Sequence, residues 1–340
     1  MAPEQAPASP SPAASLAALI WSFRVTQALH VAATLGLADL LADGPRSVAA
    51  LAAATGAHAP TLRRLLRALT TVALLTEDEQ GCFATTPLGD HLRADHPRSL
   101  RALATLTGDP FIWAAWGDLC RSILTGAPAF ARVYGEPDFD YLAKRPALAA
   151  TFHATMTGFS RSTLPDLLTA YDFAGHARIV DVGGGQGALL RGILERYPRA
   201  AGVLFDLPFV VAEARELRGT AVAGRCELVG GDMFRAVPAG GDAYLLKLIV
   251  HDWDDDAALR VLRHCRAGIV ARGRLLVLEA VVAPSNAPDP AKWADLNMLV
   301  MRGGRERTAD EFRALYTAAG FRLARIIPAG AVSVIEGIPV

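Results

Sequence analysis

A short apolar run that ends in a cluster of glycines constrains the fold of this chain more than any other stretch. Residues 179–182 are apolar apart from Asp181 and are expected to form a buried parallel strand. The glycines at 183–185 and 187 then let the backbone turn sharply and pass close to a ligand, because they lack a Cβ atom. This pattern predicts the first strand-to-helix turn of a nucleotide-binding α/β domain, although an ordinary tight turn has a similar composition.

Strand and helix patterns alternate after this turn. The expected strands are Arg178–Val182, 202–205, 226–229, 243–249 and Arg274–Glu279, and the expected helices are 188–197, 209–216, 255–270 and 309–319. Two further strands, 321–327 and 332–338, are separated by Pro328, Ala329 and Gly330 and read as a hairpin. The alternation predicts a Rossmann-like, mostly parallel seven-stranded sheet with an antiparallel last strand.

Polar side chains lie at the ends of four expected strands: Asp181, Asp206, Asp232 and Lys247. Ligands of open α/β sheets bind at the carboxyl ends of the strands. Asp206 follows the glycines by about 20 residues, the spacing at which a carboxylate can bind both hydroxyls of a ribose. Asp232 precedes Met233 and Phe234, which suit an adenine ring. One acid at a strand end is often only a helix cap, but three in register favour a nucleotide-like cofactor.

The spacing of the glycines narrows the class of cofactor. Gly183-x-Gly185-x-Gly187 lacks the G-x-G-x-x-G spacing of dinucleotide sites, and the chain has no Gly-Lys-Ser/Thr sequence for a nucleoside triphosphate. An adenosine cofactor without phosphates needs carboxylates for its ribose and little positive charge. S-adenosylmethionine meets that description.

The first hundred residues predict a winged helix. Apolar residues recur at helical spacing over 15–41. Ser47 is expected to cap a short helix that runs to Ala54, a second helix is expected at Ala59–Thr70, and a hairpin over 72–86. Arg63, Arg64 and Arg67 on the second of these helices raise the alternative of a DNA-binding regulator. The acidic wing at 77–79 and the neutral chain argue against phosphate contact, so we interpret this domain as a dimerisation module.

Residues 100–170 are expected to be helical and carry many large side chains. They fall into two clusters at helical spacing: Phe111, Trp113 and Trp116, and Phe152, Met156 and Phe159. Each cluster is compatible with ordinary core packing or with the wall of a pocket for a flat aromatic ligand.

Composition excludes several classes of protein. The 340 residues contain 34 acidic and 34 basic side chains, whereas nucleic-acid binders usually carry a basic surplus. The cysteines 82, 120, 226 and 265 are scattered singly, which argues against a disulfide framework or a zinc site. No uninterrupted apolar run reaches the roughly 20 residues of a membrane span, and the first residues do not resemble a signal peptide. We therefore expect a cytoplasmic protein.

Five motifs then occur in the order found in one enzyme family. They are Asp-Val-Gly-Gly-Gly-Gln-Gly at 181–187, Phe-Asp-Leu-Pro at 205–208, Gly-Asp-Met-Phe at 231–234, Leu-Lys-Leu-Ile-Val-His-Asp-Trp at 246–253 and Gly-Gly-Arg-Glu-Arg-Thr at 303–308. The chain resembles the S-adenosylmethionine-dependent small-molecule O-methyltransferases of the caffeic acid and bacterial natural-product type. The resemblance covers nearly all of the chain after a tail at 1–13. It implies a homodimerisation domain at 14–100, a helical pocket segment at 101–170 and a catalytic domain at 171–340.

The resemblance also implies roles for particular residues. His251 would be the general base, flanked by Glu279 and Glu306. Gly183 and Ser160 would lie near the methionine part of the cofactor. The implied cofactor site includes Asp181, Asp206, Leu207, Asp232, Met233, Phe234 and Lys247. The implied acceptor pocket consists of Trp113, Phe152, Met156, Phe159, Asn297, Met298 and Met301, with a one-residue departure from the family pattern between 295 and 303.

These observations predict methylation of a phenolic hydroxyl of an aromatic small molecule, in the biosynthesis of a natural product. An alternative keeps the fold but uses bound S-adenosylmethionine for hydroxylation or pericyclic chemistry. A metal site at His251 and the acids at 252 and 254–256 is a weaker alternative, because consecutive acids at a helix start usually interact with the helix dipole. We therefore expect no metal.

Overall fold

The computed structural model describes residues 11–284, 286 and 288–340, and these divide into two compact units, Met1–Pro110 and Phe111–Val340. The expected tail at 1–13 lies mostly outside the described residues. Its last part differs from the expectation, because helix α1 already begins at Pro12, where the Ser11 hydroxyl accepts a hydrogen bond from the amide of Ala14 at 3.2 Å.

The first unit contains the predicted winged helix. Its helices are α1 (Pro12–Trp21), α2 (Phe23–Thr34), α3 (Leu37–Leu40), α4 (Val48–Thr55), α5 (Ala59–Thr70), η1 (Gly89–Leu92) and α6 (Arg101–Gly108). A three-stranded antiparallel sheet has the order β1 (Arg46–Ser47), β3 (Cys82–Thr85), β2 (Leu75–Glu77). Ser47 caps α4 as predicted. The core of the first unit is built on side chains such as Leu51, Leu66 and Phe83.

The boundary of this unit differs from the predicted one at residue 100. Helix α6 packs against α2, with the Gln27 amide donating to the Gly108 carbonyl at 3.0 Å and His30 within hydrogen-bonding distance of the Thr105 carbonyl. Residues 101–108 therefore belong to the first unit, and only the later helices of the predicted segment belong to the second.

The surface of α1 and α2 is unusually apolar. Leu16, Leu19, Ile20, Trp21 and Phe23 are all exposed. The helical stretch Pro12–Thr34 is long and apolar enough to cross a membrane by length and composition, which corrects the expectation that no such segment exists. Arg24 and His30 interrupt the apolar residues of this stretch, so it contains no long unbroken apolar run. A helix that packs on a partner chain passes the same test.

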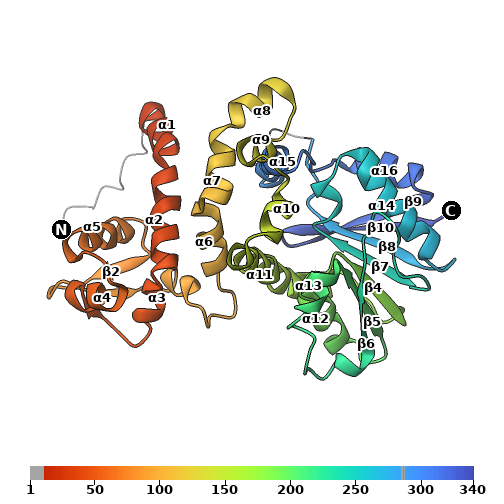
Figure 1. Ribbon diagram of the computed structural model, residues 1–340, viewed down its shortest axis with the longest axis horizontal. Coiled ribbons are helices and arrows are strands. Elements are labelled where there is room, and N and C mark those ends of the chain that lie inside the picture. The colour runs from red at the N-terminus through yellow and green to blue at the C-terminus, as the bar shows by residue number, and fades with distance from the viewer. Residues whose placement is uncertain (1–10, 285, 287) are drawn as a thin grey trace, which may run out of the picture. The chain divides into compact units, whose positions relative to one another are not determined.

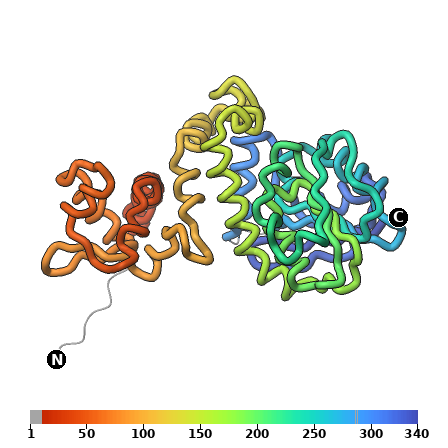
Figure 2. The backbone as a smooth tube through the Cα atoms, turned by 60° about the horizontal axis from the view of Figure 1, so that its bottom comes forward, coloured from red at the N-terminus to blue at the C-terminus, as the bar shows by residue number. Residues whose placement is uncertain are grey.

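The second unit begins with helices and continues as a doubly wound sheet. The helices are α7 (Pro110–Gly117), α8 (Leu119–Thr125), α9 (Ala129–Tyr134), α10 (Asp138–Ala143) and the long α11 (Pro146–Ala170), which runs beside the sheet in both Figure 1 and Figure 2. The strands are β4 (Arg178–Val182), β5 (Ala201–Asp206), β6 (Cys226–Gly230), β7 (Ala243–Lys247), β8 (Arg274–Glu279), β9 (Phe321–Ala329) and β10 (Val332–Pro339).

The sheet has the strand order β6-β5-β4-β7-β8-β10-β9. The first five strands are parallel, and β10 enters antiparallel between β8 and β9, which confirms the predicted fold class. Side chains alternate between two cores: Ile179 packs on the side of α11 and α12 (Ala188–Arg196), and Val180 on the side of α14 (Asp255–Gly268) and α16 (Ala309–Ala318). Both faces are covered, as the apolar strand sequences require.

A predicted strand and a predicted helix are shorter in the structure, and one helix was not predicted. The strand expected at 243–249 ends at Lys247, because Leu248 adopts a left-handed conformation with φ 54°. The helix expected at 209–216 is only α13 (Pro208–Ala212). Helix α15 (Ala291–Met301) was not predicted, and it supplies side chains to the site described below.

Candidate active site

The glycine turn after β4 is closely packed at its start, and its first glycine has a positive φ. Gly183 has φ 71°, and a Cβ atom there would lie 2.4 Å from Cδ1 of Ile249. A Cβ atom on Gly184 would lie 2.5 Å from a carboxylate oxygen of Asp181. The turn therefore brings bare backbone to the carboxyl edge of the sheet, as the sequence predicted.

Asp206, at the end of β5, is held by the same turn. One carboxylate oxygen accepts a hydrogen bond from the amide of Gly185 at 2.8 Å, and the other accepts from the amide of Leu207 at 2.7 Å. Burial raises the pKa of Asp206, against these two bonds, which lower it. Each oxygen keeps a second lone pair, so the fixed carboxylate can still accept hydrogen bonds from a diol.

Asp232 and its neighbours follow β6, two strands from β4. The Asp232 carboxylate accepts from the amide of Phe234 at 2.9 Å. Met233 and Phe234 pack against the core beneath, and the Phe234 ring lies edge-on to Trp253 with centroids 4.7 Å apart. A half-buried carboxylate beside apolar surface is the arrangement predicted for the adenine side of the site.

Asp181 and Lys247 are buried charges at neighbouring strand ends. Burial raises the pKa of Asp181 to about 7, although Lys247 opposes the shift, and burial lowers the pKa of Lys247 to about 8. Among the described residues, oxygen Oδ2 of Asp181 has no hydrogen-bond partner. Buried polar groups normally have partners, so this edge of the sheet is suited to a polar ligand.

His251 lies on a single 3-10 turn, η3 (Val250–Asp252), just beyond β7. Glu279 ends the neighbouring strand β8 and is fully buried. Its Oε1 accepts hydrogen bonds from three consecutive amides, those of Ile249 at 3.1 Å, Val250 at 2.6 Å and His251 at 3.0 Å. Glu279 therefore fixes the backbone that carries His251 and does not bond to the imidazole ring.

Glu306 is the carboxylate that bonds to the ring. Nδ1 of His251 lies 2.6 Å from Oε1 of Glu306, and both side chains are buried. Because a carboxylate accepts, Nδ1 carries the proton, and Nε2 is left for another partner. Burial favours the neutral ring, but Glu306, Asp252 and Glu279 outweigh it and raise the pKa of His251 to about 9.

The motif at 303–308 holds Glu306 in place. The Glu306 amide donates to the Asp295 carboxylate at 2.9 Å. The guanidinium of Arg307 has no exposed surface and donates to the carbonyls of Val250 and Trp253, each at 3.0 Å. Arg307 therefore ties this loop to the His251 turn. Arg307 stands within the 303–308 motif, but its position there did not predict this role.

The predicted acceptor residues come from α7, α11 and α15. Asn297 on α15 accepts a hydrogen bond from Nε1 of Trp116 at 3.0 Å, which leaves its amide nitrogen available as a donor. Met298 and Met301 are buried. The remaining predicted residues, Trp113, Phe152, Met156 and Phe159, are half-buried on α7 and α11. Trp116 was noted in the sequence only as a cluster member, and its bond to Asn297 gives it a part in the site.

Comparison with known proteins identifies the chain. Residues 116–322 match the O-methyltransferase domain, and residues 17–95 match the O-methyltransferase dimerisation domain. The chain belongs to the O-methyltransferase family. It is 43% identical to a phenazine O-methyltransferase of Lysobacter antibioticus, over 95% of each chain. It is 41% identical to an 8-amino-8-demethylriboflavin N,N-dimethyltransferase of Streptomyces davaonensis, over 92% of this chain and 91% of the relative.

A solved structure of a related enzyme contains the cofactor. An O-methyltransferase from neocarzinostatin biosynthesis, in complex with S-adenosylmethionine and 2-hydroxy-5-methyl naphthoic acid, matches with a TM-score of 0.80 and 35% identity, over 93% of this chain and 96% of that one. The present O-methyltransferase uses S-adenosylmethionine. Its own residues fit that molecule, because the turn brings glycine backbone in left-handed conformation to the carboxyl edge of the sheet, and oxygen Oδ2 of Asp181 lacks a partner among the described residues.

Arg302 and Asp138, next to this site, were not predicted from the sequence. The Arg302 guanidinium follows α15 and forms ion pairs with Asp138, at 2.7 Å, and with Asp252. It also lies over the ring of Phe139, 4.2 Å from the centroid. The only signal for Arg302 in the sequence was its place just before the 303–308 motif.

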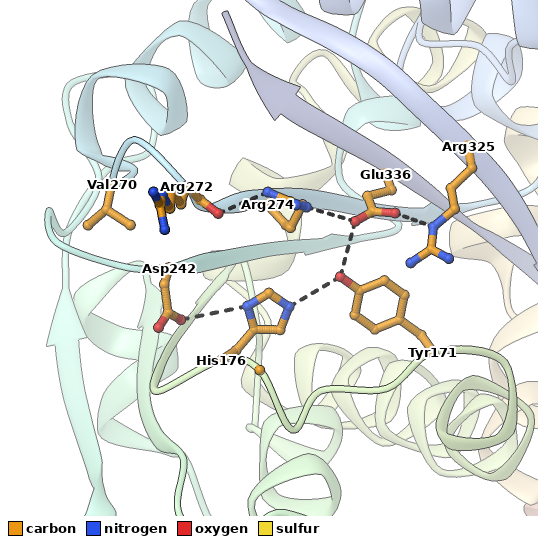
Figure 3. A pocket seen from close by; sticks show the side chains of 9 residues that line it. Tyr171, His176, Asp242, Val270, Arg272, Arg274, Arg325 and Glu336 are labelled. Carbon is orange, nitrogen blue, oxygen red and sulfur yellow. Dashed lines mark hydrogen bonds and ion pairs between the residues drawn. The ribbon is translucent and has the colours of Figure 1, made fainter.

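A separate hollow of about 450 Å³ lies at the amino ends of the strands, away from these residues. Figure 3 shows a chain of side chains across it, from Asp242 through His176 and Tyr171 to Glu336. Asp242 also accepts hydrogen bonds from the amides of residues 177 and 178. None of the predicted site residues lines this hollow, and its contacts tie the loops that begin the strands.

The acidic residues next to the His251 turn lie at the start of α14. Asp254 caps α14 through the amide of Ala257 at 2.8 Å, the cap role considered for it in the sequence. In the part of the chain that the structure describes, no three His, Cys, Asp or Glu side chains are grouped as metal ligands.

The electrostatics of this site predict a direct titration result. NMR titration of the imidazole of His251 is expected to give a pKa near 9. Glu306→Gln removes the strongest of the groups that raise it, so the pKa should fall by at least about one unit. Glu195→Gln, at an exposed position, is the control and should leave it unchanged. An unchanged His251 pKa in Glu306→Gln would show that this carboxylate does not stabilise the imidazolium.

Proposed function

We propose that this O-methyltransferase methylates a phenolic hydroxyl of an aromatic small molecule in natural-product biosynthesis, with His251 as general base. The observation that carries the proposal is the 2.6 Å contact between Nδ1 of His251 and Glu306, which orients the ring and leaves Nε2 as proton acceptor. The relatives methylate aromatic compounds, and one of them is named as an N,N-dimethyltransferase, so the acceptor atom is part of the test.

Bound S-adenosylmethionine supplies a methyl group on a positively charged sulfur. A neutral phenol is a poor nucleophile, and the chain's task is to take its proton as attack proceeds. Proton transfer from a phenol of pKa near 10 to an imidazole of pKa 6.5 costs roughly 5 kcal/mol. With the pKa of His251 raised to about 9, the mismatch falls to about one unit, or roughly 1.4 kcal/mol.

Each carboxylate near His251 has a distinct part in this proposal. Glu306 holds the proton on Nδ1 and stabilises the imidazolium that forms, as the third member of a catalytic triad does. Glu279 acts through the backbone, by fixing the turn. For the cofactor, we assign the ribose to Asp206, the adenine to Asp232, Met233 and Phe234, and the methionine part to Gly183 and Ser160. Asp181, Leu207 and Lys247 complete that site.

The acceptor pocket is assigned to the aromatic and sulfur-containing side chains of α7, α11 and α15. They are Trp113, Phe152, Met156, Phe159, Asn297, Met298 and Met301. Flat apolar walls with few polar groups suit an aromatic acceptor. The Asn297 amide, held by Trp116, provides one oriented donor.

The first unit is assigned to homodimerisation and not to DNA. Arg63 and Arg67, two of the three arginines behind the DNA-binding alternative, lie 3.3 Å and 3.7 Å from the Glu77 carboxylate of the wing. Their charge is therefore partly neutralised. The exposed apolar surface of α1 and α2 lies within the dimerisation match, and burial against a second copy would remove it from water without a membrane. The proposal accordingly places the enzyme in the cytoplasm.

The activity is tested with methyl-labelled S-adenosylmethionine and a panel of hydroxylated and amino-substituted phenazines and naphthoates. We expect O-methyl products, identified by mass spectrometry. With the best acceptor, His251→Asn should lower kcat by about 10²–10⁴-fold, the usual contribution of a general base. The kcat/KM of the wild-type enzyme should rise with pH until about pH 9, because protonated His251 accepts no proton.

The affinity of His251→Asn for S-adenosylmethionine, measured by calorimetry, serves as its control and should be unchanged. Retention of kcat within a few-fold would refute general-base catalysis. Products methylated only at nitrogen would instead refute the phenolic acceptor. A consumed cofactor without any methylated product would favour the alternative of non-methylating chemistry.

Asp206 provides a test of the cofactor assignment. Asp206→Ala removes two charge-assisted hydrogen bonds to a ribose, each worth about 1.5–3 kcal/mol, so the Kd for S-adenosylmethionine should rise by at least about tenfold. Asp310→Asn, at an exposed position of α16, should leave the Kd unchanged. Equal affinities of both variants would mean that the ribose lies elsewhere.

The dimer assignment predicts the effect of charge on the first helices. Leu19 is 71% exposed, and the double variant Leu19→Asp, Phe23→Asp places two carboxylates on this apolar surface. Sedimentation should show a monomer, since burying unpaired charge costs several kcal/mol. Leu88→Asp, at an exposed site outside these helices, should remain dimeric. A dimeric double variant would exclude this surface as the interface.

A further inference from the structure

Arg302 joins three parts of the second unit through one buried guanidinium. Its Nε donates to the Asp138 carboxylate on α10 at 2.7 Å, and its Nη1 donates to Oδ1 of Asp252 on the His251 turn. The rings of Phe139 and Phe152 lie 4.2 Å and 5.6 Å from the guanidinium carbon. Its two carboxylate partners are 3% exposed, so neither ion pair is screened by water.

The same oxygen of Asp252 faces the imidazole. Oδ1 of Asp252 lies 3.5 Å from Nε2 of His251, beyond the usual length of an N–H···O hydrogen bond. Asp252 therefore accepts a hydrogen bond from Arg302, whereas the imidazole of His251 lies within ion-pair distance of the same oxygen but too far for a good hydrogen bond. Nε2 is the nitrogen that the proposed reaction needs free.

We propose that Arg302 is a positioning residue that holds Asp252 away from Nε2 of His251 and so keeps the base available to the acceptor hydroxyl. The reason is a competition between two cations for one buried carboxylate. A bidentate-capable, always charged guanidinium is the stronger partner. Without it, Asp252 becomes an uncompensated buried anion, which would close the gap to an imidazolium N–H. This proposal rests on the proposed role of His251 for its consequence in catalysis, but not for its geometry.

The charged groups that face His251 define the expected titration. Glu306 comes from the loop before α16, Glu279 from β8 and Asp252 from the turn itself. Arg307 donates a hydrogen bond to the Val250 carbonyl of the turn, and Arg302 forms an ion pair with Asp252. Arg302 is the cation that neutralises the carboxylate nearest Nε2, so its loss should raise the pKa of His251, whereas loss of Asp252 should lower it.

A double-mutant cycle tests the proposal by NMR titration of His251 in the full-length enzyme. Arg302→Gln should raise the pKa by at least about one unit, and should lower kcat/KM near pH 7 by about tenfold with partial recovery at high pH. Asp252→Asn should lower the pKa. In the Asp252→Asn background, Arg302→Gln should cause only a small shift, because its effect acts through that carboxylate.

Arg132→Gln breaks another partly buried ion pair, with Asp118, and is the matched control that should leave the titration unchanged. If Arg302→Gln does not fold, Arg302→Lys provides the test, since it keeps the charge but bridges two carboxylates poorly, and a smaller upward shift is expected.

An unchanged or lowered pKa in the folded Arg302 variant would overturn the proposal, and so would a shift of equal size with and without Asp252. The titration needs no acceptor and no turnover. It therefore fails or succeeds independently of whether His251 is the base, which the activity of His251→Asn decides.

Discussion

The three hydrogen bonds that Glu279 accepts from the amides of residues 249–251 are the constraint on which the active site depends. A strand that ends at Lys247 must turn at once if its next residues are to stay at the sheet edge, and Leu248 does so in a left-handed conformation. Such a conformation is costly for a branched side chain and persists only where surrounding contacts determine it. The carboxylate at the end of the neighbouring strand provides those contacts, and His251 is placed as a result.

Charge around His251 is balanced by separate residues, each with its own task. Glu279 accepts hydrogen bonds from the backbone, Glu306 accepts one from Nδ1 of His251, and Arg302 neutralises Asp252, the carboxylate nearest Nε2. Buried anions without such partners would raise the basicity of the imidazole further and hold its proton. A base must be strong enough to receive a proton and free enough to be unprotonated beforehand. In the proposed role of His251 as base, Glu306 raises its pKa, while burial and the pairing of Asp252 with Arg302 limit that rise.

Much of the sheet was predictable because its strands are short apolar runs with clear ends. Arg178–Val182 and Arg274–Glu279 were predicted with their observed bounds, and Asp206 lies at a strand end beside the glycine turn as expected. Helix α15 was missed because its few polar residues give no clear amphipathic period. Asp138 and Arg302 were missed since 164 residues separate them, and an ion pair of that separation leaves no local pattern. The boundary predicted at residue 100 separates α6 from α2, on which it packs, because α6 continues the helical sequence of the following segment.

Donor and acceptor recognition depend on different kinds of structure. The residues proposed to bind the cofactor lie at strand ends, whose positions follow from the ladder of backbone hydrogen bonds, so we expect them to tolerate little change. The residues proposed to bind the acceptor lie on α7, α11 and α15, where side-chain packing would set the shape of the pocket and a substitution should leave the sheet intact. The hydrogen bond between Trp116 and Asn297 links α7 to α15. The guanidinium of Arg302, which lies over Phe139 and near Phe152 and pairs with Asp252, links α15 to α10, α11 and the His251 turn. Changes in the acceptor are therefore expected to involve this helical set, while the strand edge that binds the donor stays constant.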